Sequence, residues 1–278
     1  MQKGDTTKLK IIDAHLHFGK ESYFDDIAQR AGHLNTPEHL CAEYERLGIL
    51  HGIIMGNRSL EPKAHSYPPE FSYCIGLDNA VWQETEWRQN LALIEAHLKR
   101  KECVGIKLYP GYIHFYVSDD SLAPLYRLAE KYNKPVAVHT GLTAMSSACL
   151  KYSHPLTLDD AAAKFPGVQF VMCHLGEPWF TDAVAVLEKN PNVAADLSGM
   201  LEGKITDMDA FLHKHRRYVR DLTEWLEYLD AYGRIMFGTD WPLANLSDYI
   251  SFTKRIIPES EWEKVFFQSA CNIYHLSL

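Results

Sequence analysis

Short apolar runs rich in β-branched residues alternate along the chain with longer segments in which apolar residues recur at helical spacing. The apolar runs predict eight strands, at residues 11–17, 52–55, 72–78, 104–110, 135–139, 168–174, 193–198 and 235–240. The segments between and after them predict helices at residues 36–48, 84–101, 121–132, 157–165, 179–189, 209–232, 259–267 and 270–278. Strands that alternate with helices form parallel βαβ units, and eight units predict a closed barrel.

The predicted fold class is therefore α/β, a (β/α)8 TIM barrel. Such a barrel needs about 250 residues, so the 278 residues predict a single domain over 1–278. Residues 56–70 are polar and rich in proline, which predicts a long loop without a clear helix. The helix at 36–48 has the clearest start, because Thr36 can cap it and Pro37 suits its first position.

Composition and charge indicate which kinds of partner and which cellular compartment suit the protein. A net charge of −8 and a pI near 5.9 argue against a nucleic-acid surface and favour a small-molecule partner. Six cysteines are scattered singly, which fits reduced thiols in a cytoplasmic protein. Residues 1–10 lack the apolar core of a secretory signal, and no apolar run is long enough to span a bilayer. We therefore expect a cytoplasmic protein without a membrane partner.

Residues with metal-binding chemistry stand at the carboxyl ends of several predicted strands. His15 and His17 are one residue apart, so on a strand both imidazoles point the same way and can reach one cation. His139, His174 and Asp240 follow at the ends of three later strands. In an α/β barrel these ends meet at the mouth, where active sites lie. The pattern predicts a metal site at that mouth.

Four motifs carry a family resemblance: Ile12-Asp13-Ala14-His15-Leu16-His17, Gly105-Ile106-Lys107-Leu108-Tyr109-Pro110, His174-Leu175-Gly176 and Gly238-Thr239-Asp240-Trp241-Pro242. In these motifs and their order the chain resembles the amidohydrolase superfamily. The closest likeness is to the amidohydrolase-related group that contains aminocarboxymuconate semialdehyde decarboxylase and related decarboxylases. The resemblance runs from residue 11 to about 276. It implies a distorted barrel with one or two divalent cations, most often zinc, and often a homodimer.

The resemblance also implies roles for the five residues at the strand ends. His15, His17 and His139 would be metal ligands, because neutral imidazole nitrogens bind zinc. His174 would be a further ligand or a group that polarises the substrate, and the sequence does not separate these roles. Asp240 would bind or touch the metal and act as general base. We expect Asp240 and His174 to be the catalytic pair.

Lys107 has two interpretations. In two-metal members of the superfamily a lysine on the fourth strand becomes a carbamate that bridges both cations. We favour an unmodified lysine that binds a substrate carboxylate as a point charge, and one metal rather than two. Further residues that follow strand ends are candidates to line the substrate pocket: Tyr109, Tyr112, Glu177, Trp179 and Trp241.

Two aspartates occupy strand positions whose side chains are predicted to point into the barrel. Asp13 alternates with His15 and His17, and Asp196 lies on the seventh predicted strand. We expect both to face the barrel interior, where each could hold a ligand in place, and of the two interpretations we favour a purely structural role for both. The charged run at residues 214–220 predicts an exposed helix face.

Three functions fit this site. The leading hypothesis is a hydrolase in which zinc activates water to cleave a C–O or C–N bond in a lactone, ester or amide. The alternative is a non-oxidative decarboxylase that uses the same metal on a small carboxylic acid. A third interpretation, a barrel that binds metal only as a sensor or a structural element, predicts a closed coordination sphere, whereas five candidate ligands around an open barrel mouth predict a position left for water. Loops after the strands would set specificity, above all residues 19–35, 57–69, 111–120, 141–155 and 199–207.

Overall fold

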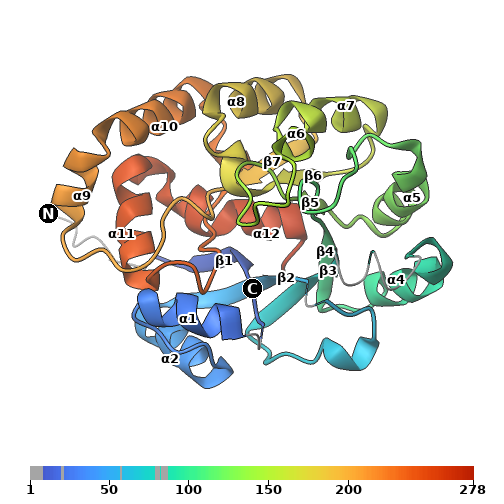
Figure 1. Cartoon of the computed structure of the whole chain (residues 1–278), viewed down its shortest axis with the longest axis horizontal. Coiled ribbons are helices and arrows are strands. Elements are labelled where there is room, and N and C mark those ends of the chain that lie inside the picture. Colours follow the sequence, from blue (N-terminus) through green and yellow to red (C-terminus); the bar gives the residue numbers. More distant parts are fainter. Residues whose placement is uncertain (1–8, 20–21, 57, 79–81, 83–86) are drawn as a thin grey trace, which may run out of the picture.

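The computed structural model describes residues 9–19, 22–56, 58–78, 82 and 87–278. Eight strands form one parallel sheet in the order β1 to β8, each paired with the next in the chain (Figure 1). The strands are β1 (Ile11–Leu16), β2 (Ile49–Met55), β3 (Phe71–Leu77), β4 (Cys103–Leu108), β5 (Val136–Val138), β6 (Phe170–Met172), β7 (Val193–Asp196) and β8 (Ile235–Met236). The predicted TIM barrel is confirmed.

Backbone hydrogen bonds bring the last strand back to the first. Ala14 N–H donates to the Phe237 carbonyl at 2.9 Å, and His17 N–H donates to the Trp241 carbonyl at 2.8 Å. Leu16 and Trp241 form a parallel bridge beyond the formal end of β8. The sheet therefore closes on itself next to the pair of histidines on β1.

The helices surround the sheet, except for α12 (Ser269–Tyr274), which lies across the middle of the view in Figure 1. The others are α1 (Ser22–Arg30), α2 (Pro37–Leu47), α4 (Leu91–Leu98), α5 (Ala123–Tyr132), α6 (Leu150–Ser153), α7 (Leu156–Lys164), α8 (Phe180–Lys189), α9 (Met208–Lys214), α10 (Arg216–Leu229) and α11 (Leu246–Ile256). Thr36 caps α2 by accepting from His39 N–H at 3.2 Å, as predicted. None of the described helices is both long and apolar enough to cross a membrane.

Several helix predictions need correction. The predicted helix at 209–232 is two helices, because the backbone leaves helical geometry at His215 between α9 and α10. The predicted loop at 19–35 contains α1. The last barrel helix is α11, and the Asn245 side chain caps it by accepting from the backbone N–H groups of Ser247 and Asp248. The predicted helix at 84–101 begins outside the described residues; a 3-10 turn (Trp87–Asn90) leads into α4. The loop at 56–70 contains only a 3-10 turn (Pro62–Ala64) in its described part.

The apolar core has two layers. One fills the barrel with small and medium side chains such as Ile12, Ala14 and Ala194, and α12 adds Ala270 and Tyr274 to it. The other lies between the sheet and the helices. This arrangement leaves polar side chains of the barrel interior concentrated at the carboxyl ends of the strands.

A β-bulge in β1 changes which side chains face inward. Asp13 pairs with Gly52 and Leu16 with Ile54, so three steps along β1 match two along β2. Asp13 consequently points outward, where its carboxylate accepts from Tyr44 of α2 at 3.0 Å. The prediction that Asp13 faces the barrel interior is wrong, because simple alternation does not survive a bulge.

Candidate metal centre

The end of β1 and the segment after β8 bring together two imidazoles and a carboxylate. His17 Nε2 lies 3.1 Å from Asp240 Oδ1, and His15 Nε2 lies 3.5 Å from the same oxygen. Asp240 N–H donates to the His15 carbonyl at 2.8 Å, which fixes this approach. Among the described residues, neither His15 Nε2 nor Asp240 Oδ1 has a hydrogen-bond partner, although both are buried. Buried polar atoms without partners are rare and indicate a missing ligand or ion.

The ends of β5 and β6 add two more imidazoles. His139 Nδ1 lies 3.2 Å from His174 Nε2, and the rings of His174 and His15 have centroids 4.8 Å apart. His174 has a φ of 62°, so the chain turns sharply there and directs the ring toward the other histidines. The structure thus gathers His15, His17, His139, His174 and Asp240 at one end of the barrel.

Hydrogen-bond partners assign the tautomers of three of these rings. His15 Nδ1 donates to the Asp196 carboxylate at 2.9 Å, and His139 Nε2 donates to the Leu142 carbonyl at 3.0 Å. The Ser198 hydroxyl donates to Asp196, so its oxygen accepts from His174 Nδ1 at 2.8 Å. The other nitrogen of each neutral ring therefore carries a lone pair.

These lone pairs point at one another. His139 Nδ1 and His174 Nε2 face each other without a hydrogen between them, and His15 Nε2 faces the Asp240 carboxylate. Such an arrangement is repulsive unless a cation lies among the acceptors. Imidazole nitrogens with one carboxylate suit zinc and related divalent metals. The residues present therefore fit a divalent cation.

Burial and local charges keep the site in the protonation state that metal binding needs. Burial, with the charge of Lys107, lowers the pKa of His15 from 6.5 to about 4. Burial likewise lowers the pKa of His174, and it places the pKa of His139 well below its usual value. Burial would raise the pKa of Asp240, but contact with His17 and the charges of His174 and His15 lower it overall. Neutral imidazoles and an ionised carboxylate are the metal-binding forms.

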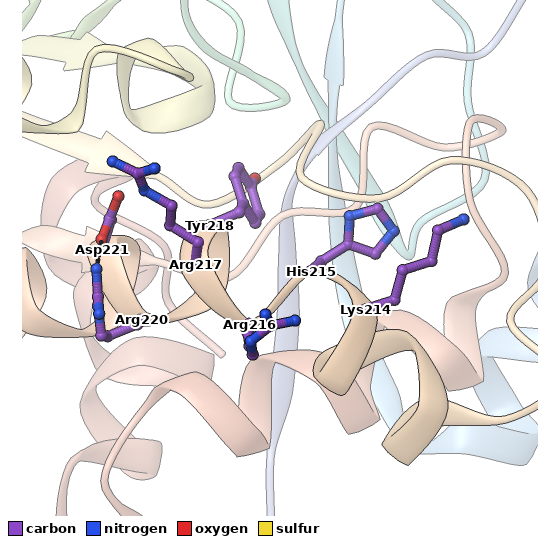
Figure 2. Close-up of a pocket in the computed structure, with 7 residues that line it drawn as sticks. All are labelled: Lys214, His215, Arg216, Arg217, Tyr218, Arg220 and Asp221. Atoms are coloured by element: carbon purple, nitrogen blue, oxygen red, sulfur yellow. Dashed lines mark hydrogen bonds and ion pairs between the residues drawn. The ribbon is translucent and has the colours of Figure 1, made fainter.

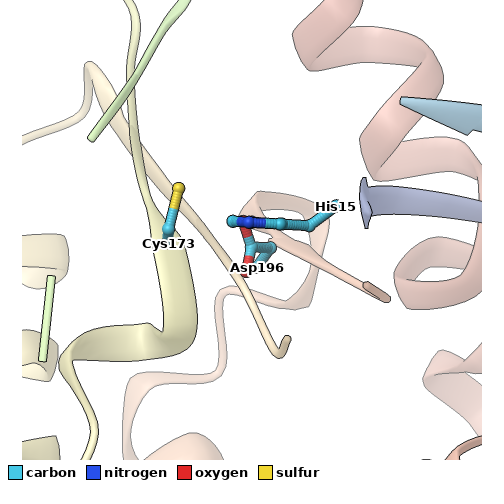
Figure 3. A group of neighbouring side chains, drawn as sticks. All are labelled: His15, Cys173 and Asp196. Atoms are coloured by element: carbon cyan, nitrogen blue, oxygen red, sulfur yellow. The ribbon is translucent and has the colours of Figure 1, made fainter. Parts of the chain in front are cut away.

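A second group of side chains that could bind a metal lies on the other side of His15. His15, Cys173 and Asp196 are all buried, and Figure 3 shows the His15 ring against the Asp196 carboxylate with Cys173 on a neighbouring segment. Lys107 Nζ donates to Cys173 Sγ at 2.8 Å, and the Nδ1 hydrogen of His15 is already bound by Asp196. A cationic ammonium beside the thiol disfavours a second cation, so the group around Asp240 is the better metal site.

The structure separates the predicted substrate-binding residues. Lys107 lies close enough to His15 for its charge to lower the pKa of that ring, and Lys107 Nζ is 5.3 Å from the centroid of the Tyr109 ring. Trp241 is 1% exposed and packs against His33 in the layer outside the sheet, so it is placed as a core residue. Trp179 packs against His154, with ring centroids 4.7 Å apart.

Two aromatic residues contact the candidate ligands, one of them, Phe24, outside the predicted set. Phe24 of α1 stacks on His17, with centroids 5.9 Å apart and planes inclined by 22°. The Tyr112 ring lies 4.8 Å from that of His139. Tyr112 lies just after β4, as its place after a strand end predicts. Phe24 was missed because residues 19–35 are predicted as a loop, although Phe24, Ile27, Ala28 and Ala31 recur at helical spacing.

The basic run at the junction of α9 and α10 lines a wide surface depression of about 950 Å³ (Figure 2). Lys214, Arg216, Arg217 and Arg220 are exposed, as the sequence predicted. None of the five candidate ligands lines this depression.

Comparisons with known proteins bear on the family and the fold. The sequence matches the amidohydrolase family model over residues 79–276. A search of curated proteins finds no match.

Three solved structures illustrate the likeness in fold. An uncharacterised TIM-barrel protein from Bordetella bronchiseptica has a TM-score of 0.69 at 21% identity, covering 96% of this chain and 99% of that chain. A probable 2-pyrone-4,6-dicarboxylic acid hydrolase from Acinetobacter baumannii with bound citric acid has 0.63 at 15%, covering 96% and 99%. A 5-carboxyvanillate decarboxylase from Novosphingobium aromaticivorans, complexed with manganese and 4-hydroxy-3-methoxy-5-nitrobenzoic acid, has 0.68 at 14%, covering 99% and 98%.

Proposed function

Because the chain belongs to the amidohydrolase family, we propose that it is a metal-dependent hydrolase acting on a small substrate that carries a carboxylate. The bond cleaved is C–O or C–N, in a lactone, an ester or an amide. The ligands proposed for one divalent cation, Zn²⁺ or a related metal, are His15, His17, His139, His174 and Asp240. When bound, the cation supplies Lewis-acid chemistry that acidifies water and polarises a carbonyl.

One observation carries the choice of hydrolysis. The imidazole nitrogens of His15, His139 and His174 that face the centre bear lone pairs, while their hydrogens point away to protein acceptors. Asp240 is ionised, and its Oδ1 lies 3.1 Å from His17 Nε2 without a hydrogen-bond partner among the described residues. The site is therefore equipped to take a proton from attacking water, with Asp240 as general base and as the donor to the leaving group.

Lys107 supports a carboxylate on the substrate. Its ammonium is buried, and among the described residues it forms no ion pair with a carboxylate and has only the Cys173 thiol as hydrogen-bond partner. A buried ammonium without an anion is costly, so a substrate carboxylate would complete the site. Tyr109, Phe24 and Tyr112 would form the walls around that substrate.

A decarboxylase remains the second candidate, supported by the likeness in fold to 5-carboxyvanillate decarboxylase with bound manganese. That reaction replaces a carboxylate by hydrogen, so the site must deliver a proton to carbon. Among the centre-facing groups whose tautomers are assigned, none carries a hydrogen in the resting state. Proton delivery would therefore need prior protonation of Asp240 or of a histidine.

The experiment loads EDTA-treated protein with Zn²⁺ or Mn²⁺ and supplies panels of carboxylated lactones, esters, amides and hydroxybenzoates. Acid release in a pH-stat measures lactone and ester hydrolysis, ammonia or amine release measures amide cleavage, and headspace analysis measures carbon dioxide. Metal-dependent hydrolysis that is lost in Asp240→Asn is the expected result. Carbon dioxide release without hydrolysis would replace this proposal by the second candidate.

A further inference from the structure

The segment that ends β7 contacts two of the proposed ligands from behind. Asp196 Oδ2 accepts from His15 Nδ1, and Asp196 Oδ1 accepts from the backbone N–H of His174 at 3.0 Å and from Ser198. Asp196 and Ser198 are fully buried and lie on the far side of the rings from Asp240. We propose that Asp196 and Ser198 are positioning residues that set the tautomers of His15 and His174. The inference rests on the proposed function, because bare Nε2 atoms matter only if they bind a cation.

Asp196 acts directly on His15. An ionised carboxylate can only accept, so a neutral His15 must carry its hydrogen on Nδ1 and leave Nε2 bare. An asparagine at this position could turn an amide N–H toward His15 and reverse the tautomer.

Asp196 acts on His174 through Ser198. The hydroxyl hydrogen of Ser198 goes to Asp196, and its backbone N–H also donates to Oδ1 at 3.2 Å. The Ser198 oxygen is left only as an acceptor, so His174 must carry its hydrogen on Nδ1. One carboxylate therefore determines the tautomers of two rings, one on β1 and one in the turn after β6.

Gly199 provides the space for this arrangement. Its φ is 73°, and a Cβ built there would lie only 2.8 Å from His174 Nδ1. A side chain at this position would push the ring away from Ser198. The absence of a side chain is thus needed for the contact that assigns the tautomer.

The test is long-range ¹H–¹⁵N NMR of histidine rings in metal-free protein at pH 7.5, with His15→Gln and His174→Gln used to assign the two signals. We expect both rings in the Nδ1–H form. Ser198→Ala should move His174 toward the Nε2–H form and leave His15 unchanged, and Asp196→Asn should move both. The matched control is Ser269→Ala, because Ser269 is equally buried and donates one hydrogen bond to the Tyr232 carbonyl.

Metal affinity provides the second measurement. Competition with a chromophoric chelator should show about 10- to 100-fold weaker Zn²⁺ binding in Ser198→Ala and no change in Ser269→Ala. An Nε2–H tautomer for His174 in the unmodified protein, or an unchanged tautomer in Ser198→Ala, overturns the inference. If adding Zn²⁺ changes neither the histidine ring signals nor the melting temperature, the proposed metal site itself is refuted. If Asp196→Asn does not fold, the serine variant still decides.

Discussion

Replacing Asp240 by asparagine should stabilise the metal-free protein while abolishing its response to metal. Asp240 Oδ1 and His15 Nε2 are buried acceptors 3.5 Å apart, and neither has a hydrogen-bond partner among the described residues. An asparagine amide can donate to His15 Nε2 with little change of shape. Asparagine also tolerates the φ of 56° at this position.

The expected magnitude follows from the cost of unsatisfied buried groups, about 1–3 kcal/mol each. Because the Asp240 side chain is 17% exposed, we expect a gain at the lower end, about 1–2 kcal/mol in the free energy of unfolding. A metal at about 100 times its Kd stabilises the unmodified protein by about 2.7 kcal/mol. The order of stability should therefore reverse when metal is added.

Urea denaturation followed by tryptophan fluorescence, in EDTA and then in excess Zn²⁺, measures both effects. Asp230→Asn is the matched control, since Asp230 is exposed and has a φ of 46° at the end of α10; its stability should change by less than about 0.5 kcal/mol. The reasoning fails if Asp240→Asn is less stable than the unmodified protein in EDTA, or if metal stabilises both equally.

Three further predictions test separate parts of the structure. Lys107→Met removes a buried ammonium without a carboxylate partner among the described residues, so we expect an unchanged or higher free energy of unfolding. For carboxylated substrates only, kcat/KM should fall by at least about 100-fold. An equal loss on uncharged substrates contradicts this prediction. Asp13→Ala leaves the Tyr44 hydroxyl and the Thr239 N–H and hydroxyl without their acceptor, and should cost at least about 3 kcal/mol in urea denaturation, against about 1 kcal/mol for Tyr44→Phe. Burial lowers the pKa of His51 from 6.5 to about 4. The unfolded chain therefore protonates this imidazole at a higher pH than the folded protein does, and His51 should lower the free energy of unfolding by about 2 kcal/mol between pH 7.5 and pH 5. His51→Gln should remove that part of the pH dependence, as measured by urea denaturation.

The sequence was most informative where chemistry and position coincide. His15, His139 and Asp240 each stand where a predicted strand ends, and parallel strands in a barrel bring such ends together. The start of α2 could be predicted because a threonine that can cap a helix directly precedes a proline, which suits the first helical position.

Other features depend on contacts between distant segments, which periodicity does not contain. The bulge in β1 reverses the direction of Asp13, because pairing with β2 rather than local alternation sets the register. Trp241 follows Asp240 directly, yet its ring turns into the layer beside α2, against His33 and His39. The stacking of Phe24 on His17 depends on where α1 packs against the end of β1, which the helical spacing of Phe24, Ile27 and Ala28 alone does not give.

The bonds that join β1 to the segment after β8 have a consequence for how activity is acquired during folding. Asp240 meets His15 only when Ala14, His17 and Thr239 have made their backbone contacts across the seam of the sheet. A shortened chain that stops before residue 237 could pack most of its strands and still lack the carboxylate. Metal uptake during refolding would thus report that this seam has closed, and mutations far from the cation that loosen the seam would weaken metal binding.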